Sequence, residues 1–269
     1  MGIQRKLKRI VETATRTHIL RTLPRGSSLF YDIATHLPQL EMVTIFDVGA
    51  NVGQSCSQYI GNFPQADIYC FEPVSTTFSI LEKKLRKYKN VRAFQLALGA
   101  DRGKGYVRLE GPSDMFFLEK SLPEEARQHS FEQVAVDTVD GFCARMSISH
   151  INYMKVDAEG GELDILLGAD RMLESQAIDL VETETGMNPT NTRHVPFEIV
   201  KKMLESKSYF LFGMYEQTHE WLSGLPCLRR VNALFISSAA MHENALTKNI
   251  ATNDRTLDER LKRAAGNTG

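Results

Sequence analysis

The sequence predicts an α/β fold with a mostly parallel sheet and helices on both faces of that sheet. Short apolar runs rich in β-branched residues alternate with amphipathic segments from about residue 43 to about residue 237. Three strand–helix or strand–loop alternations fall between residues 43 and 97 alone. Such alternation indicates βαβ units, whose crossover helices cover a parallel sheet.

The predicted elements follow one another without an internal repeat. Strands are expected where β-branched runs stop at Gly49, before Pro73 or at Asp157, and Leu81 and Leu85 mark a helix with a charged outer face. In chain order the predicted elements are a strand over 43–48, a helix over 50–60, a strand over 68–71, a helix over 78–89, strands over 91–97 and 151–156, a helix over 162–173, a strand over 178–184, a helix over 197–206, and strands around 210–215 and 231–236.

The pattern defines one globular domain over residues 43–238 with three further stretches. Residues 1–42 lead into the domain, and residues 239–269 are predicted to be a polar tail. Residues 100–134 are polar and rich in turn residues, with strand-like alternation at 106–109. This insertion is expected to be either a lid that binds substrate or a surface excursion without chemistry.

The net charge of −1 hides an uneven distribution. Residues 1–26 hold seven basic residues and one acidic residue, and the rest of the chain holds 25 basic and 32 acidic residues. An acidic body argues against nucleic acid as a partner, because phosphate binding relies on a basic surface.

The basic residues within positions 1–23 alternate with apolar ones at helical spacing. This spacing predicts a helix that either packs on the domain or meets a membrane surface or a partner protein. The segment lacks the continuous apolar stretch of a secretion signal, and no apolar run in the chain approaches the length of a transmembrane helix.

The four cysteines are scattered, with no CxxC pair and no Cys/His cluster. They predict neither a disulfide framework nor a structural zinc site, and they favour a reducing compartment. We therefore expect a cytoplasmic protein. The cysteines are Cys56, Cys70, Cys143 and Cys227.

A glycine-rich turn, DVGANVG at residues 47–53, joins the first predicted strand to the first helix. Glycines at such a turn let the backbone approach a ligand, and the helix N-terminus offers free N–H groups. Gly49 and Gly53 do not have the GxGxxG spacing, and Asp47 disfavours a diphosphate at this place. The alternative is a tight turn that needs glycine for its positive φ alone.

Glu72 ends the second predicted strand, 25 residues after Asp47. In doubly wound sheets an acid at this place accepts hydrogen bonds from the two ribose hydroxyls of an adenosine-containing cofactor. A carboxylate suits this task because it can accept two hydrogen bonds at once. By itself, an acid before Pro73 would be a solvated turn residue, but beside the glycine-rich turn it favours a nucleoside site.

Five motifs, in this order, resemble those of FkbM-type S-adenosylmethionine-dependent methyltransferases. The resemblance covers about residues 43–237, and its most specific part is the last block. Ala158 and Gly161 of that block stand where such proteins commonly have Val and Ala. The motifs are DVGANVG at 47–53, FEP at 71–73, ALG at 97–99, TVD at 138–140 and MKVDAEGGE at 154–162.

The resemblance implies the class I methyltransferase fold, a Rossmann-like, seven-stranded, mostly parallel sheet whose last strand is antiparallel. It also implies S-adenosyl-L-methionine as the cofactor and O-methylation of a sugar, a glycan or a polyketide-like small molecule. The residues expected to bind the cofactor are Asp47, Gly49, Ala50, Asn51, Gly53, Glu72, Pro73, Ala97 and Asp157.

Four carboxylates lie at the ends of two neighbouring predicted strands and are the candidate catalytic groups. Such a cluster is costly to desolvate unless it meets a cation, hydroxyl donors or water. One role is the general base for the acceptor hydroxyl, and another is to hold a divalent cation. We expect at least one of the four to be structural, capping a helix or pairing with Lys155, Arg193 or Lys201. The four are Asp157, Glu159, Glu182 and Glu184.

Two histidines add candidates for the base, because His194 and His219 follow the fifth and sixth predicted strands of the domain, on the expected acceptor side. Residues 115–117 (MFF) of the insertion would either line an acceptor pocket or anchor the insertion to the core. A nicotinamide-dependent oxidoreductase is disfavoured by the absence of GxGxxG. A non-catalytic accessory subunit is disfavoured by the four intact carboxylates.

Overall fold

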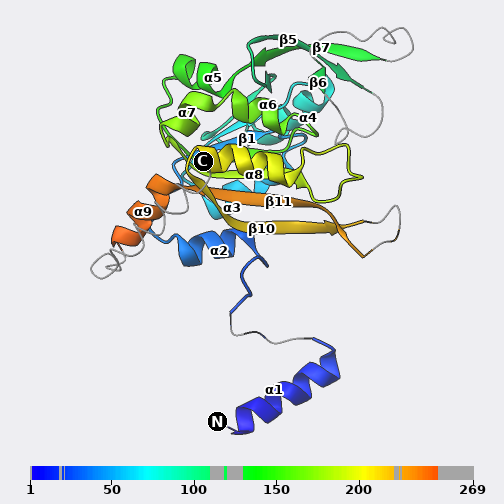
Figure 1. Cartoon of the computed structure of the whole chain (residues 1–269), viewed down its shortest axis with the longest axis vertical. Helices are drawn as coiled ribbons and strands as arrows, with labels where there is room; N and C mark the ends of the chain where they lie inside the picture. Colours follow the sequence, from blue (N-terminus) through cyan, green and yellow to red (C-terminus); the bar gives the residue numbers. More distant parts are fainter. Residues whose placement is uncertain are drawn as a thin grey trace.

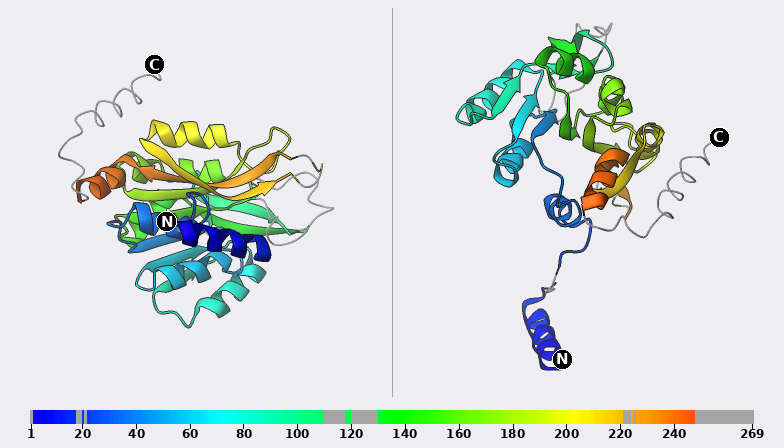
Figure 2. Two further views of the ribbon diagram at one scale, coloured as in Figure 1. Left: turned by 90° about the horizontal axis from the view of Figure 1, so that it is seen from below. Right: turned by 90° about the vertical axis from the view of Figure 1, so that its left-hand side faces the viewer.

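The computed structural model describes residues 2–17, 20, 22–109, 118–119, 130–220, 224 and 226–247. Within these residues a seven-stranded sheet runs through the domain, in the order β10-β11-β9-β8-β1-β2-β3. Helices cover both of its faces (Figure 1, Figure 2). The five neighbouring strands β9, β8, β1, β2 and β3 are parallel to one another, and β11 is antiparallel to both of its neighbours. The predicted sheet is therefore confirmed.

The elements agree with most of the predicted ones to within a few residues. The strands of this sheet are β1 (Thr44–Val48), β2 (Asp67–Phe71), β3 (Val91–Phe94), β8 (Ile151–Val156), β9 (Ile178–Gly186), β10 (Tyr209–His219) and β11 (Leu228–Ser237). The helices are α1 (Gly2–Thr15), α2 (Leu29–His36), α3 (Gln54–Asn62), α4 (Ser75–Leu85), α5 (Val139–Met146), α6 (Glu162–Leu167), α7 (Asp170–Glu174), α8 (Phe197–Ser206) and α9 (Ser238–Thr247).

Two apolar clusters bury the two faces of the sheet. On one face the ring of Phe142 from α5 meets Phe71 edge-on, with 4.8 Å between ring centroids. On the other face Tyr59 of α3 packs against Tyr153 of β8. All nine residues of β9 are buried, as expected for a strand covered on both sides.

The stretch predicted as an insertion supplies most of a second sheet. Within the described residues this sheet has the order β4-β7-β5-β6, and the chain leaves the large sheet after Phe94 to enter it. The strand predicted over 91–97 is therefore two strands, because Ala97 pairs with Val136 of the second sheet. Residues 115–117 lie outside the described residues. The strands are β4 (Ala97–Leu98), β5 (Gly103–Arg108), β6 (Leu118–Glu119) and β7 (Phe131–Asp137).

The helix predicted over 162–173 is broken into α6 and α7. Gly168 lies at the break, where an added Cβ would come within 2.0 Å of the carbonyl oxygen of Gly99. The carboxylate of Asp140 then begins α7 by accepting hydrogen bonds from the backbone N–H groups of Arg171 and Met172. A close approach to the start of the second sheet thus ends the first of these helices.

The two ends of the described chain differ from expectation. The tail predicted from residue 239 begins as helix α9, whose Asn244 side chain donates to the carbonyl oxygen of His36, 3.0 Å away. Helix α1 lies apart from the domain, so the expected packing of this helix on the domain is not seen (Figure 1, Figure 2). Among the described helices, none has the length and apolar character needed to cross a membrane.

Candidate active site

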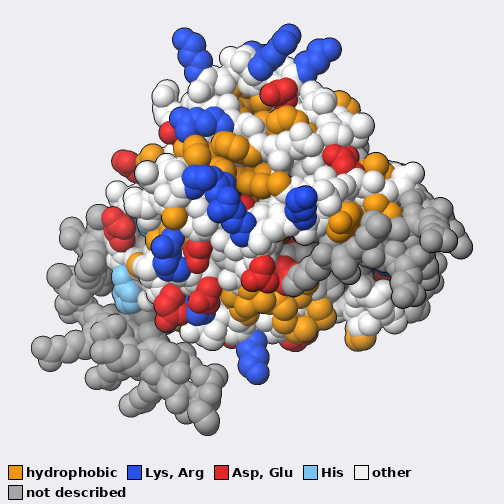
Figure 3. All heavy atoms as spheres, turned by 90° about the horizontal axis from the view of Figure 1, so that it is seen from above, with side chains coloured by type: hydrophobic (Ala, Val, Ile, Leu, Met, Phe, Trp, Pro, Cys, Tyr) orange, Lys and Arg blue, Asp and Glu red, His pale blue; other side chains and the backbone are white. Residues whose placement is uncertain are grey.

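A cavity of about 350 Å³ opens where β1, β2 and β8 end, a volume typical of small-molecule sites. Its wall combines apolar side chains, among them Phe71, Leu98 and Val107, with polar side chains of α3, β8 and β10. Basic, acidic and apolar side chains are interspersed on the face of the molecule shown in Figure 3. The residues expected to bind the cofactor that line this cavity are Gly49, Ala50, Asn51, Glu72, Pro73, Ala97 and Asp157.

The turn after β1 lies directly against the loop after β8. Gly49 has a φ of 83°, and a Cβ at this position would come within 1.8 Å of the carbonyl oxygen of Asp157. Gly53, with a φ of 78°, is the N-cap of α3 and is not part of the described wall. Both glycines are therefore required by the backbone.

Three backbone N–H groups of the turn are already engaged within the protein, before helix α3 begins at Gln54. Those of Gly49 and Ala50 donate to the carbonyl oxygen of Phe71, at 3.1 and 2.9 Å. That of Asn51 donates to Glu72. At these three positions the turn therefore offers a ligand close approach to the backbone rather than open donors.

Glu72 presents its carboxylate at the wall of the cavity. Oε2 accepts from the N–H of Asn51 at 3.1 Å and Oε1 from the N–H of Val74 at 2.9 Å. Burial raises the pKa of Glu72 to about 7, and the two backbone hydrogen bonds oppose this shift. Each oxygen keeps a lone pair for one further donor.

Asp47 is placed differently from the other residues expected to bind the cofactor. Its side chain is 1% exposed, it is not part of the described wall, and neither carboxylate oxygen has a hydrogen-bond partner. Burial raises its pKa to about 6, against the opposing charge of Lys155. Its position supports a structural or electrostatic role beneath the cavity rather than direct contact with a ligand.

The four candidate catalytic carboxylates fall into different environments. Asp157 and Glu159 line the cavity, whereas Glu182 and Glu184 do not. The Nζ of Lys155 donates to Asp157 at 2.9 Å, so one of the expected ion pairs is present. Burial would lower the pKa of Lys155, but the charges of Asp157, Asp47 and Glu182 outweigh it and raise that pKa.

Glu182 lies inside the sheet. It accepts a very short hydrogen bond from the hydroxyl of Tyr153 and another, 3.0 Å long, from the side-chain amide of Asn232. Burial raises its pKa. Its 3% exposure and its protein partners fit the expected structural member of the four, so its placement does not support a catalytic role.

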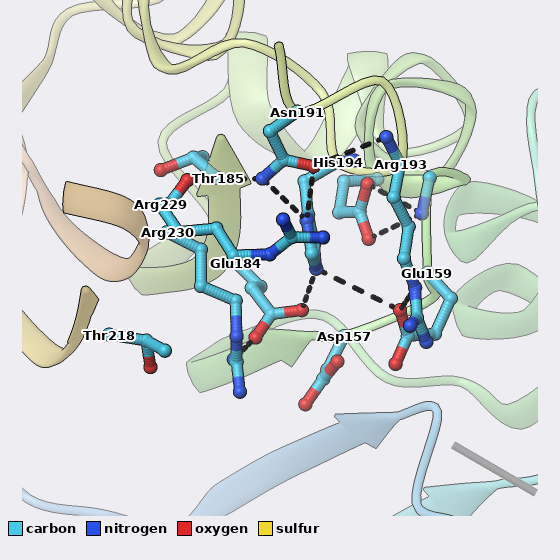
Figure 4. A network of polar contacts seen from close by, with 12 residues as sticks. Asp157, Glu159, Glu184, Thr185, Asn191, Arg193, His194, Thr218, Arg229 and Arg230 are labelled. Carbon is cyan, nitrogen blue, oxygen red and sulfur yellow. Dashed lines mark hydrogen bonds and ion pairs between the residues drawn. The ribbon is translucent and has the colours of Figure 1, made fainter. Parts of the chain in front are cut away.

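Figure 4 shows a buried network that links Glu159 to Glu184 through His194. The Nε2 of His194 lies 2.7 Å from Glu184 and 3.8 Å from Glu159, and its Nδ1 lies 2.9 Å from the side-chain nitrogen of Asn191. The Asn191 oxygen lies 3.1 Å from the same Nδ1 and also accepts from the backbone N–H groups of residues 193 and 194. The carboxylate of Glu184, in contrast, can only accept. His194 therefore carries its proton on Nε2 and donates it to Glu184.

Two arginines complete this network. The Nε of Arg193 lies 2.6 Å from Glu159, the second of the expected ion pairs, and Arg230 forms a close ion pair with Glu184. Lys201, in contrast, pairs with Glu205 on its own helix. Burial lowers the pKa of His194 and raises that of Glu159, so the ring is neutral and the carboxylate is a stronger base than usual.

Within the described residues, Glu159, Glu184 and His194 are the group whose ligand atoms could hold a metal ion, since these atoms lie within 4.8 Å of one another. An ion there would compete with Arg193 and Arg230 for the two carboxylates. It would also require the proton on Nε2 of His194 to leave. The arginines already supply the positive charge that a cation would bring.

The two histidines are not equivalent. His194 is buried and is not part of the described wall, so its placement does not support the role of base. His219 is exposed at the end of β10, and no contact joins it to the four carboxylates within the described part of the chain. Its placement gives no support to a catalytic role.

Sequence reasoning missed several wall residues. Gln54 and Gln58 lie one turn apart on α3, and this i, i+4 pair at the carboxyl end of β1 could have been found from the predicted helix. Glu216 reaches the cavity from an irregular part of β10, and no strand periodicity indicates it.

The strand order, the antiparallel β11 and the cavity between the glycine-rich turn and Glu72 together define a class I methyltransferase fold. A family model described as the methyltransferase FkbM domain matches residues 47–221, and the chain belongs to this family.

Similar proteins carry related names at low sequence identity. The chain is 26% identical over 201 residues to Methyltransferase 1 of Beauveria bassiana, an alignment that covers 66% of the chain and 76% of that protein. It is 23% identical over 141 residues to the 2-O-methyltransferase NoeI of Sinorhizobium fredii, covering 48% of the chain and 58% of that protein. The solved N-terminal domain of EvdMO1, in the presence of SAH and D-fucose, aligns with 88% of the chain and 97% of that domain, with 8% identity and a TM-score of 0.42.

Proposed function

We propose that this methyltransferase uses S-adenosyl-L-methionine to methylate a hydroxyl group of a sugar, a glycan or a related natural product. The observation that carries the proposal is a single cavity that brings Glu72 and Asn51 to the same wall as Asp157 and Glu159. One pair suits a nucleoside, and the other suits a reacting hydroxyl.

The residues present fit the cofactor. Glu72 keeps one lone pair on each oxygen, which matches the two neighbouring hydroxyls of a ribose. Leu96, Ala97 and Leu98 line the cavity and would face the adenine, where backbone groups and apolar contact suffice. The turn at Gly49 and Ala50 would face the methionine part. When bound, S-adenosyl-L-methionine supplies a methyl group that is already activated on a sulfonium.

The protein's own contribution would be to hold the acceptor oxygen in line with that methyl group, because positioning can supply most of the barrier reduction in such a transfer. Glu159 is the best-placed base for the hydroxyl proton. It lines the cavity, and burial raises its pKa. Its backbone has a left-handed φ of 52°, and the ion pair with Arg193 fixes the carboxylate.

Asp157 would assist Glu159 rather than act as the base in its place. Its carboxylate accepts a hydrogen bond from the Nζ of Lys155 and lines the cavity beside Glu159. Glu162 fixes the loop between them, since its carboxylate accepts hydrogen bonds from the backbone N–H groups of Ala158 and Gly160. These hydrogen bonds hold the backbone that carries Asp157 and Glu159 in place.

A hydroxyl acceptor is supported by the presence of carboxylates and amides on the polar wall and by the similarity to the 2-O-methyltransferase NoeI. The test is transfer of a labelled methyl group to a panel of glycosides and polyketide-like alcohols, with the products identified by mass spectrometry and NMR. Methyl ethers are the expected products. Methylation at nitrogen or carbon alone, or no turnover despite cofactor binding, would contradict O-methylation.

A further inference from the structure

Strand β10 carries a bulge beside the cavity. Tyr215 pairs with Asn232 and Thr218 pairs with Arg230, so Glu216 and Gln217 together stand opposite a single residue of β11. Glu216 has a φ of 46°, a left-handed conformation that is uncommon for residues other than glycine. Bulges of this kind redirect a side chain and are frequent next to active sites.

The bulge changes the face on which Glu216 lies. Tyr215 packs in the cluster that contains Tyr153, on the face of the sheet where Asn232 also lies. Regular alternation would send the next side chain to the opposite face, where Met214 packs. Instead, Glu216 lines the cavity and accepts a hydrogen bond from the amide of Asn232 at 3.2 Å.

Glu216 differs from Asp157 and Glu159, two other carboxylates that line the cavity. Asp157 is paired with Lys155 and Glu159 with Arg193, whereas no ion pair holds Glu216 in the described part of the chain. Among the residues that the structure describes, its carboxylate accepts a hydrogen bond from Asn232, whose amide also donates to the buried Glu182. A carboxylate can accept about four hydrogen bonds, so Glu216 retains most of its capacity toward the cavity.

We propose that Glu216 recognises the acceptor by accepting hydrogen bonds from two neighbouring hydroxyl groups beside the one that is methylated. The assignment rests on the proposed function and specifies a polyhydroxylated acceptor. Gln54 and Gln58 on the same wall supply both donors and acceptors for further hydroxyls. The opposite part of the cavity, at Glu72, remains the nucleoside end.

The test uses the full chain loaded with S-adenosylhomocysteine and a panel of methyl glycosides at millimolar concentration, with binding followed by saturation-transfer NMR. Glu216→Gln is compared with Glu198→Gln, which changes an exposed carboxylate of α8 outside the cavity wall. Glu216→Gly is the second variant, because glycine keeps the left-handed φ of the bulge while removing the carboxylate. Calorimetry on the same samples measures S-adenosylhomocysteine affinity.

Both Glu216 variants should bind glycosides roughly tenfold more weakly than the wild type does, as expected when a charged hydrogen-bond acceptor is lost. It should be unchanged in the Glu198 variant, and S-adenosylhomocysteine affinity should be unchanged in all. Glycoside affinity within twofold of wild type in both Glu216 variants would overturn the assignment. A wild type that binds S-adenosylhomocysteine but no glycoside would also overturn it. A wild type that does not bind S-adenosylhomocysteine would instead contradict the proposed function.

Discussion

The carboxylate of Glu72 and the backbone N–H of Asn51 are joined by a hydrogen bond of 3.1 Å. This contact ties the turn after β1 to the end of β2. Because Val74 donates to the other oxygen of Glu72, the carboxylate is held at both ends. The glycine-rich turn and the end of β2, which the sequence assigns to a nucleoside site, therefore meet at the wall of one cavity.

Substitution of Glu72 should weaken cofactor binding. In Glu72→Gln an amide nitrogen replaces one acceptor oxygen, and a hydrogen bond to a charged group is worth about 1.5–3 kcal/mol, so the affinity for S-adenosylhomocysteine should fall roughly 10- to 100-fold. Isothermal calorimetry measures this change. Glu82→Gln, an exposed acid on α4, is the matched control. Equal affinities of wild type and Glu72→Gln would remove the ribose assignment.

The same carboxylate should make cofactor binding depend on pH. Since the pKa of Glu72 is raised to about 7, the side chain gains a proton below neutral pH and loses acceptor capacity for a diol. Affinity should therefore be greater at pH 8 than at pH 6. The Glu72→Gln variant should lack this dependence. Parallel pH profiles for the two proteins would show that another group is responsible.

Asp47 should make the fold less stable as the pH rises. Its folded-state pKa, about 6, lies above the ordinary value of 3.8, so its contribution is fully present below about pH 4 and is lost through pH 6. The shift corresponds to about 3 kcal/mol. Urea unfolding at pH 4.5 and pH 7.5 measures how much unfolding free energy each protein loses as the pH rises. This loss should be smaller in Asp47→Asn than in the wild type. The exposed Asp101→Asn should behave like wild type, and an equal loss in all three proteins would contradict the prediction.

Gly49→Ala should disrupt the domain. The added Cβ would lie 1.8 Å from the carbonyl oxygen of Asp157, and the φ of 83° is unfavourable for alanine, so we expect a loss of more than about 2 kcal/mol in unfolding free energy. Gly61→Ala is the control, because nothing lies within 4 Å of its Cβ position and alanine favours its helix, α3. Thermal unfolding followed by circular dichroism compares them. A Gly49 variant as stable as the control would show that the turn can relax.

Glu159→Gln should impair methyl transfer without affecting cofactor binding. Loss of a general base typically lowers kcat about 10²- to 10⁴-fold. Single-turnover transfer with an acceptor found in the panel measures the chemical step, and calorimetry measures S-adenosylhomocysteine affinity. Glu205→Gln on α8, away from the cavity wall, is the control. Unchanged turnover would rule out Glu159 as the base.

The arrangement of the large sheet was predictable from the sequence because β-branched runs and turn residues mark its strands individually. The strand over 151–156 and the helix over 197–206 are predicted to the residue. The break at Gly168 was not predictable, since it is imposed by the carbonyl oxygen of Gly99, a contact between distant parts of the chain.

The candidate site divides in the same way. Glu72 and Asp157 could be assigned to one cavity because each ends a strand of a parallel sheet. The partners of Glu184 could not be, because they come from the loop at 187–196 and from antiparallel β11, and no periodicity relates these segments. Asp47 lies near the end of a strand as well, yet its side chain is buried and is not part of the described wall, which its position in the motif does not reveal.

Ala97 and Leu98 belong to the second sheet, where they pair with Val136 and Asp137 of β7. The segment that would face the adenine is thus mechanically coupled to the excursion that follows it in the chain. A change in the length of the chain between β4 and β7 would therefore be expected to shift β7 and, through its pairing with Ala97 and Leu98, the residues that would contact the adenine.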